Sequence, residues 1–258
     1  MNNDFWFALL LCAAAGLSTV LGALIVFVTR TKSERLLSFS LGFAAGMMIS
    51  ISMLEMFASA NRTFAERLGT ATGSVVSAAL LSLGAVAGML FDKLVPHENL
   101  EEDGERPHKN LLRVGMVSAI ALAVHNFPEG AATMMAGISN KGIGLSVALA
   151  VALHNIPEGI SIALPVYYGT GSRTKAFLYT LAAGVAEPLG GLMAALIFGT
   201  HLSELMTGAV FAYVAGIMLY ISFEELIPSS RQYGYKGLAL TALFIGICVM
   251  PLSGAFGI

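Results

Sequence analysis

The sequence predicts an all-α membrane protein of eight transmembrane helices, and three observations support that prediction. Of the 258 residues, 56% are hydrophobic and only 12% are charged, whereas soluble domains carry about 25% charged residues. The apolar residues gather in runs of about 20 or more, which is the length that crosses the hydrocarbon core of a bilayer. All Lys and Arg residues fall in connections or at the ends of these runs. Lipid is therefore the expected solvent, and the net charge of −2 argues against a nucleic-acid partner.

Eight apolar runs are long enough to cross a membrane, and each is expected to form one span. They cover residues 5–28, 36–58, 73–91, 111–137, 142–168, 174–199, 205–227 and 237–258. The connections are short, except for a polar loop at about 92–110 that carries several acidic residues and is expected to be a solvated linker. We therefore expect one transmembrane domain over residues 1–258.

The distribution of basic residues predicts the orientation of these spans. Of the 14 Lys and Arg residues, eleven fall in one set of alternate connections and the remaining three fall in the other set. Because Lys and Arg are enriched in cytoplasmic loops, the side with eleven should be cytoplasmic, which places both termini outside and the 92–110 loop inside. The chain is accordingly expected to be a multi-pass protein of the cytoplasmic (inner) cell membrane.

Several acidic residues do not follow the basic ones into the connections. They lie inside apolar runs with no basic partner in the same run: Glu55, Glu129, Glu158, Glu187, Glu224 and Glu225. An ionised carboxylate at the centre of a bilayer costs roughly 3 kcal/mol. Three near the centre would cost on the order of 10 kcal/mol unless they were protonated or matched by a cation. A bound dication would match them, so the sequence predicts a metal site within the membrane.

A repeated motif in the fourth and fifth spans sharpens this prediction. Residues 125–130 and 154–159 both read His-Asn-x-Pro-Glu-Gly. On a helix, residues four positions apart share one face, about 6 Å apart along the axis. Each motif can therefore present an imidazole and a carboxylate to one ion. The two pairs are His125 with Glu129, and His154 with Glu158.

Proline residues should give these spans the open backbone of a buried site. Pro128 and Pro157 each leave one carbonyl of their helix without its usual donor, and such backbone is tolerated in a bilayer only beside a cavity or other protein. The sixth span adds a third carboxylate beside a third proline, in the dipeptide Glu187-Pro188. Glu187 and the two histidines lie near the midpoints of their spans, so three spans should bring ligands to one depth.

The chemistry of these ligands narrows the choice of metal without selecting one. Imidazole, carboxylate and amide oxygen without sulfur suit zinc (Zn2+), iron(II) (Fe2+), manganese (Mn2+), cobalt (Co2+) and cadmium (Cd2+) better than copper(I). Magnesium prefers oxygen ligands alone. The two cysteines, Cys12 and Cys248, lie in separate apolar runs and are expected to be small hydrophobic residues. The ligand types leave all five ions open.

A weaker repeat links the second and seventh spans. Residues 45–55 and 215–225 share six of eleven positions and end at Glu55 and Glu225. In the predicted topology these two spans cross in opposite directions, as the fourth and fifth do, which is expected of transporters built from inverted repeats. Glu55 should lie toward the outer face and Glu225 toward the cytoplasmic face, where each is either solvated or at the mouth of a path.

The doubled motif, followed by Glu-Pro in the next span, resembles the ZIP (Zrt/Irt-like) family of metal transporters and especially its bacterial zinc-uptake branch. The resemblance covers nearly the whole chain. It implies a three-plus-two-three bundle of inverted repeats, often a homodimer, that moves metal into the cytoplasm and is not an enzyme. It also implies a binuclear site, in which Glu129 and Glu158 bridge the two ions. One ion would be bound by His125, Glu129, His154 and Glu158, and the other by Asn126, Asn155 and Glu187.

The 92–110 loop departs from this resemblance. Many members of the family carry a histidine-rich loop between the third and fourth spans, whereas this loop holds only His97 and His108. These two residues could collect cytoplasmic metal, but an ordinary solvated loop is the simpler expectation.

Three other readings of the doubled motif are compatible with the residues alone. An intramembrane zinc-dependent hydrolase would need an open metal position and a general base, and the sequence lacks His-Glu-x-x-His. A haem protein ligated by His125 and His154 would need an apolar pocket, which the carboxylates four residues later disfavour. A polar network that only packs two helices would supply no cation to offset the free-energy cost of ionised carboxylates in the membrane. Metal transport is the favoured function.

Overall fold

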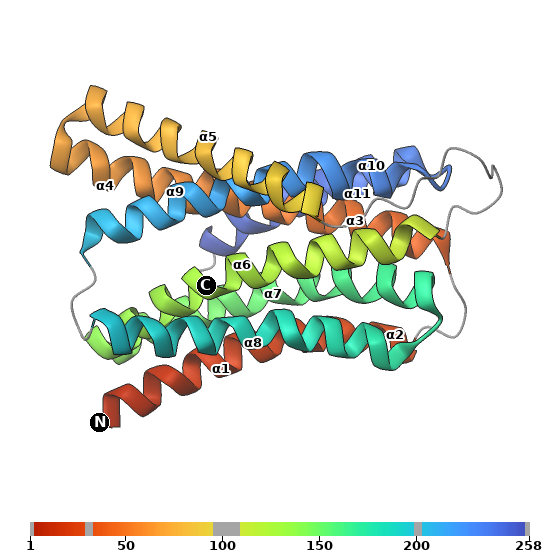
Figure 1. Cartoon of the computed structure of the whole chain (residues 1–258), viewed down its shortest axis with the longest axis horizontal. Helices are drawn as coiled ribbons and strands as arrows, with labels where there is room; N and C mark the ends of the chain where they lie inside the picture. The colour runs from red at the N-terminus through yellow and green to blue at the C-terminus, as the bar shows by residue number, and fades with distance from the viewer. Residues whose placement is uncertain (1–2, 29–32, 95–108, 199–202, 256–258) are drawn as a thin grey trace.

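The computed structural model describes residues 3–28, 33–94, 109–198 and 203–255, and these residues are helical apart from short connections (Figure 1). In chain order the helices are α1 (Asn3–Ala23), α2 (Ile25–Val28), α3 (Glu34–Ser50), η1 (Ile51–Phe57), α4 (Ala58–Leu68), α5 (Thr70–Leu94), α6 (Lys109–Ser139), α7 (Lys141–Thr170), α8 (Arg173–Phe198), α9 (Glu204–Ile221), η2 (Ser222–Leu226), α10 (Ile227–Arg231) and α11 (Lys236–Ala255). The segments η1 and η2 are π-helical turns inside longer helices.

These helices confirm the prediction of an all-α membrane protein. Within the described residues, seven segments are long and apolar enough to cross a membrane, beginning with Asn3–Val28 and ending with Glu204–Arg231. A shorter apolar segment, Lys236–Val249, lies within α11 and corresponds to the eighth predicted span. Over the residues that the structure describes, each of the eight apolar runs therefore lies in one helix or in a series of consecutive helices.

Two helices continue beyond the apolar runs from which they were predicted. The second span reaches Leu68 through α4, and α5 reaches Leu94. Asp92 is therefore a residue of α5 and not part of the polar loop. It is buried, and its carboxylate forms an ion pair with Arg113 of α6. The rest of that loop, with His97 and His108, lies outside the described residues, and the expectations for it stay predictions.

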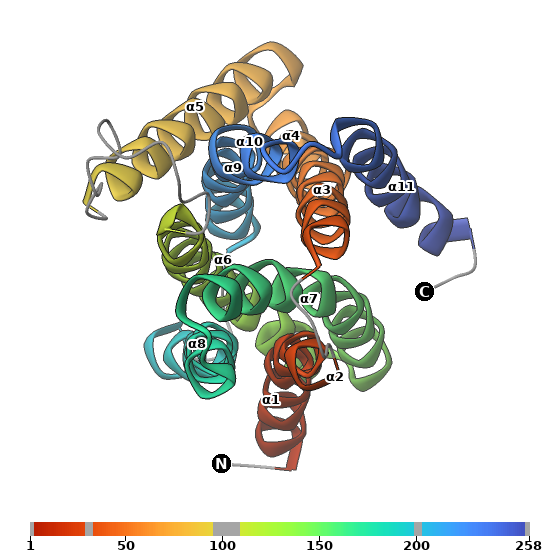
Figure 2. The ribbon, with the colours of Figure 1, turned by 90° about the vertical axis from the view of Figure 1, so that its right-hand side faces the viewer.

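The helices form two bundles that lie side by side (Figures 1 and 2). The first bundle contains α1, α6, α7 and α8, and the second contains α3, α5, α9 and α11 with the short helices that extend them. The bundles meet where α3 packs on α7 and α9 packs on α6. We call the end where α1 and α9 begin the terminal end. The opposite end, where α6 and α8 begin with Arg113 and Arg173 nearby, is the basic end.

Close glycine contacts show that the second bundle is an inverted repeat. Gly46 of α3 packs against the carbonyl of Leu243 in α11, and Gly216 of α9 packs in the same way against the carbonyl of Leu81 in α5. The two glycines occupy equivalent positions in the weak repeat of residues 45–55 and 215–225. A π-helical turn follows each of them, and α3 and α9 run in opposite directions. The weak repeat in the sequence is therefore structural.

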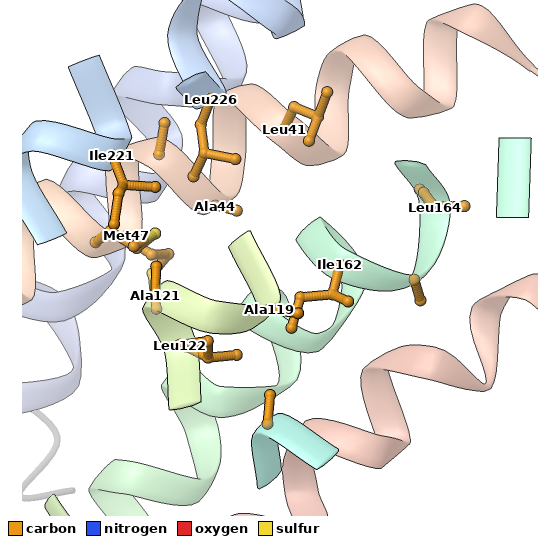
Figure 3. Close-up of a cluster of buried hydrophobic side chains, with 14 of the residues drawn as sticks. Leu41, Ala44, Met47, Ala119, Ala121, Leu122, Ile162, Leu164, Ile221 and Leu226 are labelled. Carbon is orange, nitrogen blue, oxygen red and sulfur yellow. The ribbon is translucent and has the colours of Figure 1, made fainter. Parts of the chain in front are cut away.

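A cluster of buried apolar side chains fills the space between the bundles toward the basic end (Figure 3). Leu41 and Met47 of α3 and Leu226 of η2 come from the second bundle, and Leu122 of α6 and Ile162 of α7 come from the first. Because lipid tails are as apolar as these side chains, close packing and not transfer from water holds them together. An ion moving between the bundles would meet this apolar cluster on its way to the basic end.

Candidate metal site

Six of the seven predicted ligands have side chains buried in the first bundle, none more than 6% exposed. They are His125, Asn126 and Glu129 from α6, Asn155 and Glu158 from α7, and Glu187 from α8. The seventh, His154, belongs to α7, but its side chain lies outside the described part of the structure. Three helices thus bring these six polar side chains into one buried region.

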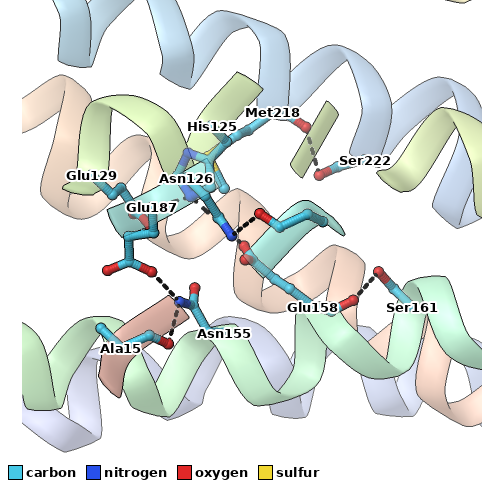
Figure 4. Close-up of polar contacts among 11 residues, drawn as sticks. Ala15, His125, Asn126, Glu129, Asn155, Glu158, Ser161, Glu187, Met218 and Ser222 are labelled. Carbon is cyan, nitrogen blue, oxygen red and sulfur yellow. Dashed lines mark hydrogen bonds and ion pairs between the residues drawn. The ribbon is translucent and has the colours of Figure 1, made fainter. Parts of the chain in front are cut away.

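His125 lies between two carboxylates (Figure 4). Its Nε2 atom is 3.0 Å from Oε1 of Glu129, one turn later on α6, and 3.9 Å from Oε1 of Glu158 on α7. In a tetrahedral zinc site with bonds of about 2.0–2.2 Å, ligand atoms lie about 3.4 Å from one another. Each distance lies within about 0.5 Å of that value, so small side-chain shifts would bring Nε2 of His125 to ligand spacing with either carboxylate.

These three groups are not yet a complete ligand set. Among the described side chains, no three His, Cys, Asp or Glu residues are arranged to hold an ion without adjustment. The repeated motif places His154 one turn before Glu158 on α7, as His125 lies one turn before Glu129 on α6. By its place in the repeated motif, His154 stays the predicted fourth ligand.

Glu187 and the two asparagines form a second group of polar contacts. Asn155 donates from Nδ2 to Oε2 of Glu187 at 2.8 Å and to the carbonyl of Ala15 at 3.0 Å (Figure 4). Asn126 donates from Nδ2 to the carbonyl of Ala183 at 3.2 Å. The amide oxygens of both asparagines are buried and have no hydrogen-bond partner among the described residues. Because buried polar atoms are nearly always partnered, these oxygens are suited to receive a cation.

Proline and glycine shape the backbone around both groups. Pro128 and Pro157 follow the two predicted ligand histidines within helices α6 and α7, and Pro188 directly follows Glu187 in α8. Each proline removes one donor from its helix. Gly130, which ends the first motif, packs against the carbonyl of Glu187, and a side chain there would separate α6 from α8. The motif therefore combines predicted ligands with the close helix packing that brings them together.

A cavity of about 290 Å³ lies between the bundles on the terminal side of these groups. Glu55 of η1 and Glu129 of α6 both line it. Its lining also includes Ala132 and Val147, which lie beyond Glu129 toward the terminal end of α6 and α7. The cavity has room for several waters at about 30 Å³ each. It connects Glu55, which is exposed, with Glu129, which is buried.

At the basic end, Arg113 of α6 binds carboxylates from two helices of the second bundle. Its guanidinium donates to Asp92 of α5 at 2.6 Å and to Glu225 of η2 at 2.8 Å. The side chains of Arg113, Asp92 and Glu225 are 18%, 11% and 7% exposed. Glu225 is therefore buried and ion-paired with Arg113, and the expectation of a solvated carboxylate is wrong at this position. We call these three residues the Arg113 cluster.

The first span, for which the sequence pattern predicts no role, contributes backbone contacts to this region. The carbonyl of Ala15 in α1 receives the hydrogen bond from Asn155, and Gly16 packs against the carbonyl of Gly184 in α8. Residues 15–22 and 183–190 both read Ala-Gly with a second Gly six residues after the first. That shared spacing was the signal that could have linked the first span to the sixth.

Comparisons with known proteins extend over both bundles. A family model described as ZIP Zinc transporter matches residues 95–254. The protein named zinc transporter ZupT of Streptococcus mutans is 39% identical to this chain, and the alignment covers 98% of each. ZupT of Chlorobaculum parvum is 41% identical over 98% of each chain. ZupT of Oceanobacillus iheyensis is 41% identical over 97% of this chain and 98% of the relative.

Proposed function

This chain belongs to the family of ZIP zinc transporters, and on that premise we propose which residues bind the ion and how the ion crosses the bundles. The chain takes up divalent metal ions, with zinc as the substrate. It is a multi-pass membrane protein and a transporter, not an enzyme, so the hydrolase reading is set aside.

Zinc binds in a binuclear site between α6, α7 and α8. The first position is formed by His125, Glu129, His154 and Glu158, and the second by Asn126, Asn155 and Glu187. Glu129 and Glu158 bridge the two positions. The contacts of His125 with both bridging carboxylates and of Asn155 with Glu187 support this division.

The observation on which this proposal chiefly rests is the burial of three carboxylates in one region. Glu129 is 6% exposed, and Glu158 and Glu187 are fully buried. At roughly 3 kcal/mol each, three ionised carboxylates would cost on the order of 10 kcal/mol in the membrane centre without positive charge beside them. One or two zinc ions supply that charge, and the two buried amide oxygens supply further ligands.

The ion reaches this site from the terminal end and leaves toward the basic end. The cavity between Glu55 and Glu129 supports the first half of this route. On the other side, the apolar cluster with Leu122 and Ile162 lies one turn from the site, and the Arg113 cluster joins the bundles beyond it. This arrangement is open toward the terminal end and closed toward the basic end, so release requires the bundles to separate at the basic end.

The terminal end faces outward and the basic end faces the cytoplasm, in a cell membrane with both chain termini outside. The eleven-to-three distribution of Lys and Arg supports this orientation. A dication that moves down an inside-negative potential of 100 mV gains roughly 4–5 kcal/mol. That would sustain accumulation on the order of a thousandfold, since each 1.4 kcal/mol is a factor of ten.

Uptake into vesicles of purified protein tests the substrate and the site together. Labelled zinc uptake is measured alone and in competition with iron(II), manganese, cobalt and cadmium, the other ions that the ligand types suit. Glu158→Ala should abolish uptake while the protein still inserts and stays monodisperse, whereas Glu66→Ala, at an exposed position of α4, should transport normally. Wild-type uptake by Glu158→Ala would refute the proposed site. Cross-linking in membranes tests the homodimer that the family resemblance implies.

A further inference from the structure

The first bundle is an inverted repeat down to individual hydrogen bonds. Asn126 of α6 donates to the carbonyl of Ala183 in α8 at 3.2 Å, and Asn155 of α7 donates to the carbonyl of Ala15 in α1 at 3.0 Å. The two asparagines hold the same place in the repeated motif. Helix α6 is therefore related to α8 as α7 is related to α1.

Glycine contacts extend this correspondence along α1 and α8. The two helices cross where Gly16 and Gly184 each pack against the other's carbonyl. Six residues after each of these glycines, a second glycine packs against the residue between Asn and Pro of a motif. These second contacts are Gly22 with the carbonyl of Ile156 and Gly190 with the carbonyl of Phe127.

This alignment makes Thr19 the counterpart of Glu187. Each residue comes three positions after the glycine at the crossing of α1 and α8. Gly130, at the end of the first motif, packs against the carbonyl of Glu187, and Gly159, at the end of the second motif, packs against the carbonyl of Thr19. Both side chains are fully buried. Thr19 is thus in the place in α1 that Glu187 has in α8.

The two counterparts differ in charge and in their hydrogen bonds. Glu187 accepts a hydrogen bond from Asn155, whose amide donates to two acceptors. Asn126 donates to the carbonyl of Ala183 alone among the described contacts. The hydroxyl oxygen of Thr19 and the amide oxygen of Asn126 are both buried without a hydrogen-bond partner in the described part of the chain. We call Asn155 with Glu187 the charged half-site, and Asn126 with Thr19 the neutral half-site.

We propose that Thr19 sets the charge of the metal site, by supplying a neutral oxygen where the repeat would otherwise place a fourth carboxylate. This inference rests on the proposed binuclear zinc site. Three carboxylates leave two zinc ions with one unmatched positive charge, and a fourth carboxylate would match it. Unmatched charge is costly in the membrane interior, so the neutral half-site weakens binding of the second ion and favours its release.

Moving the carboxylate from α8 to α1 tests this proposal. Zinc binding to purified protein is measured by calorimetry and by metal analysis, and uptake is measured in vesicles. Glu187→Thr should lose the second zinc ion. The double variant Thr19→Glu with Glu187→Thr should regain it, because the carboxylate then lies in the inverted half-site beside Asn126. A purely structural role for Thr19 predicts no such rescue.

A fourth carboxylate at position 19, with Glu187 kept in place, provides the complementary test. Thr19→Glu alone should bind the second zinc ion more tightly by about tenfold or more, equivalent to 1.4 kcal/mol, and should lower the maximal rate of uptake. Ser18→Glu is the matched control, since a carboxylate one residue earlier is turned about 100° around the helix. It should produce neither tighter binding nor rescue of Glu187→Thr.

The possible outcomes separate this inference from the proposed function. If wild-type protein binds no zinc, or Glu158→Ala binds as well as wild type, the proposed site is wrong. If those two proteins behave as proposed but the double variant binds no more zinc than Glu187→Thr, the inference about Thr19 alone is overturned. If Thr19→Glu does not fold, Thr19→Asp and the uncharged Thr19→Gln are measured. Misfolding of all three would show that Thr19 only packs helices and would also overturn the inference.

Discussion

Replacing Arg113 with methionine should loosen the junction between the bundles at the basic end. The guanidinium bonds to Asp92 at 2.6 Å and Glu225 at 2.8 Å, and the three side chains are at most 18% exposed. Removing one partner of a buried ion pair costs about 3–5 kcal/mol, because the remaining charge stays buried without a match. Partial exposure of Arg113 places the expected loss at about 3 kcal/mol. For a chain of this size that corresponds to a melting temperature lower by about 6–12 °C.

Thermal unfolding of purified protein in detergent measures this loss. The triple variant Arg113→Met, Asp92→Asn and Glu225→Gln should recover most of it, since no charge is then left buried alone. Arg67→Met is the matched control. It breaks the pair of Arg67 with Glu204 at the terminal end, where the side chains are 58% and 67% exposed and water screens the interaction. If Arg113→Met lowers the melting temperature no more than Arg67→Met, the Arg113 cluster does not tie the bundles together.

Three further predictions follow from the route, the orientation and the packing. Glu55→Gln should raise the apparent KM for zinc by about threefold at an ionic strength of 0.01 M and hardly at all at 0.5 M. The reason is that salt screens the attraction between this carboxylate and an ion about 10 Å away. Equal effects at both ionic strengths would contradict a role of Glu55 in attracting the ion. In a cysteine-free background, a cysteine at Asn140 should react with an impermeant reagent added outside and one at Ser172 should not, and the reverse pattern would overturn the orientation. Gly130→Ala should reduce zinc uptake and lower the melting temperature, because its Cβ would collide with the carbonyl of Glu187; unchanged values would refute the close packing of α6 on α8.

Much of this fold could be predicted because lipid imposes a simple rule. A chain in a bilayer must satisfy its backbone within helices, so each apolar run of sufficient length became a helix. The rule is weaker at the ends of the helices. The charge of Asp92 predicts a loop, yet α5 continues past this residue, and Arg113 of α6 binds its carboxylate. The Arg113 cluster depends on contacts between distant segments that hydropathy does not report.

The candidate site was predictable where its ligands are side chains in a local pattern. The spacing of His and Glu in residues 125–130 and 154–159 marked α6 and α7, and the Glu-Pro dipeptide marked α8. The sequence does not predict the contribution of α1, because its contacts with the other helices of the site are largely made by its backbone. The carbonyl of Ala15 and the close approach at Gly16 carry no ionisable group that would have drawn attention to the first span.

Zinc content combined with X-ray absorption at the zinc edge tests the central claim most directly. We predict about two zinc ions per chain, bound only by nitrogen and oxygen at about 2.0–2.2 Å and with an imidazole contribution. Glu129→Ala and Glu158→Ala should each remove most of the metal, and the double variant should lose little more, because both carboxylates act on one shared centre. Zinc that stays bound in the double variant, or that shows sulfur ligands at about 2.3 Å, would contradict a site built from His125, Glu129, His154 and Glu158.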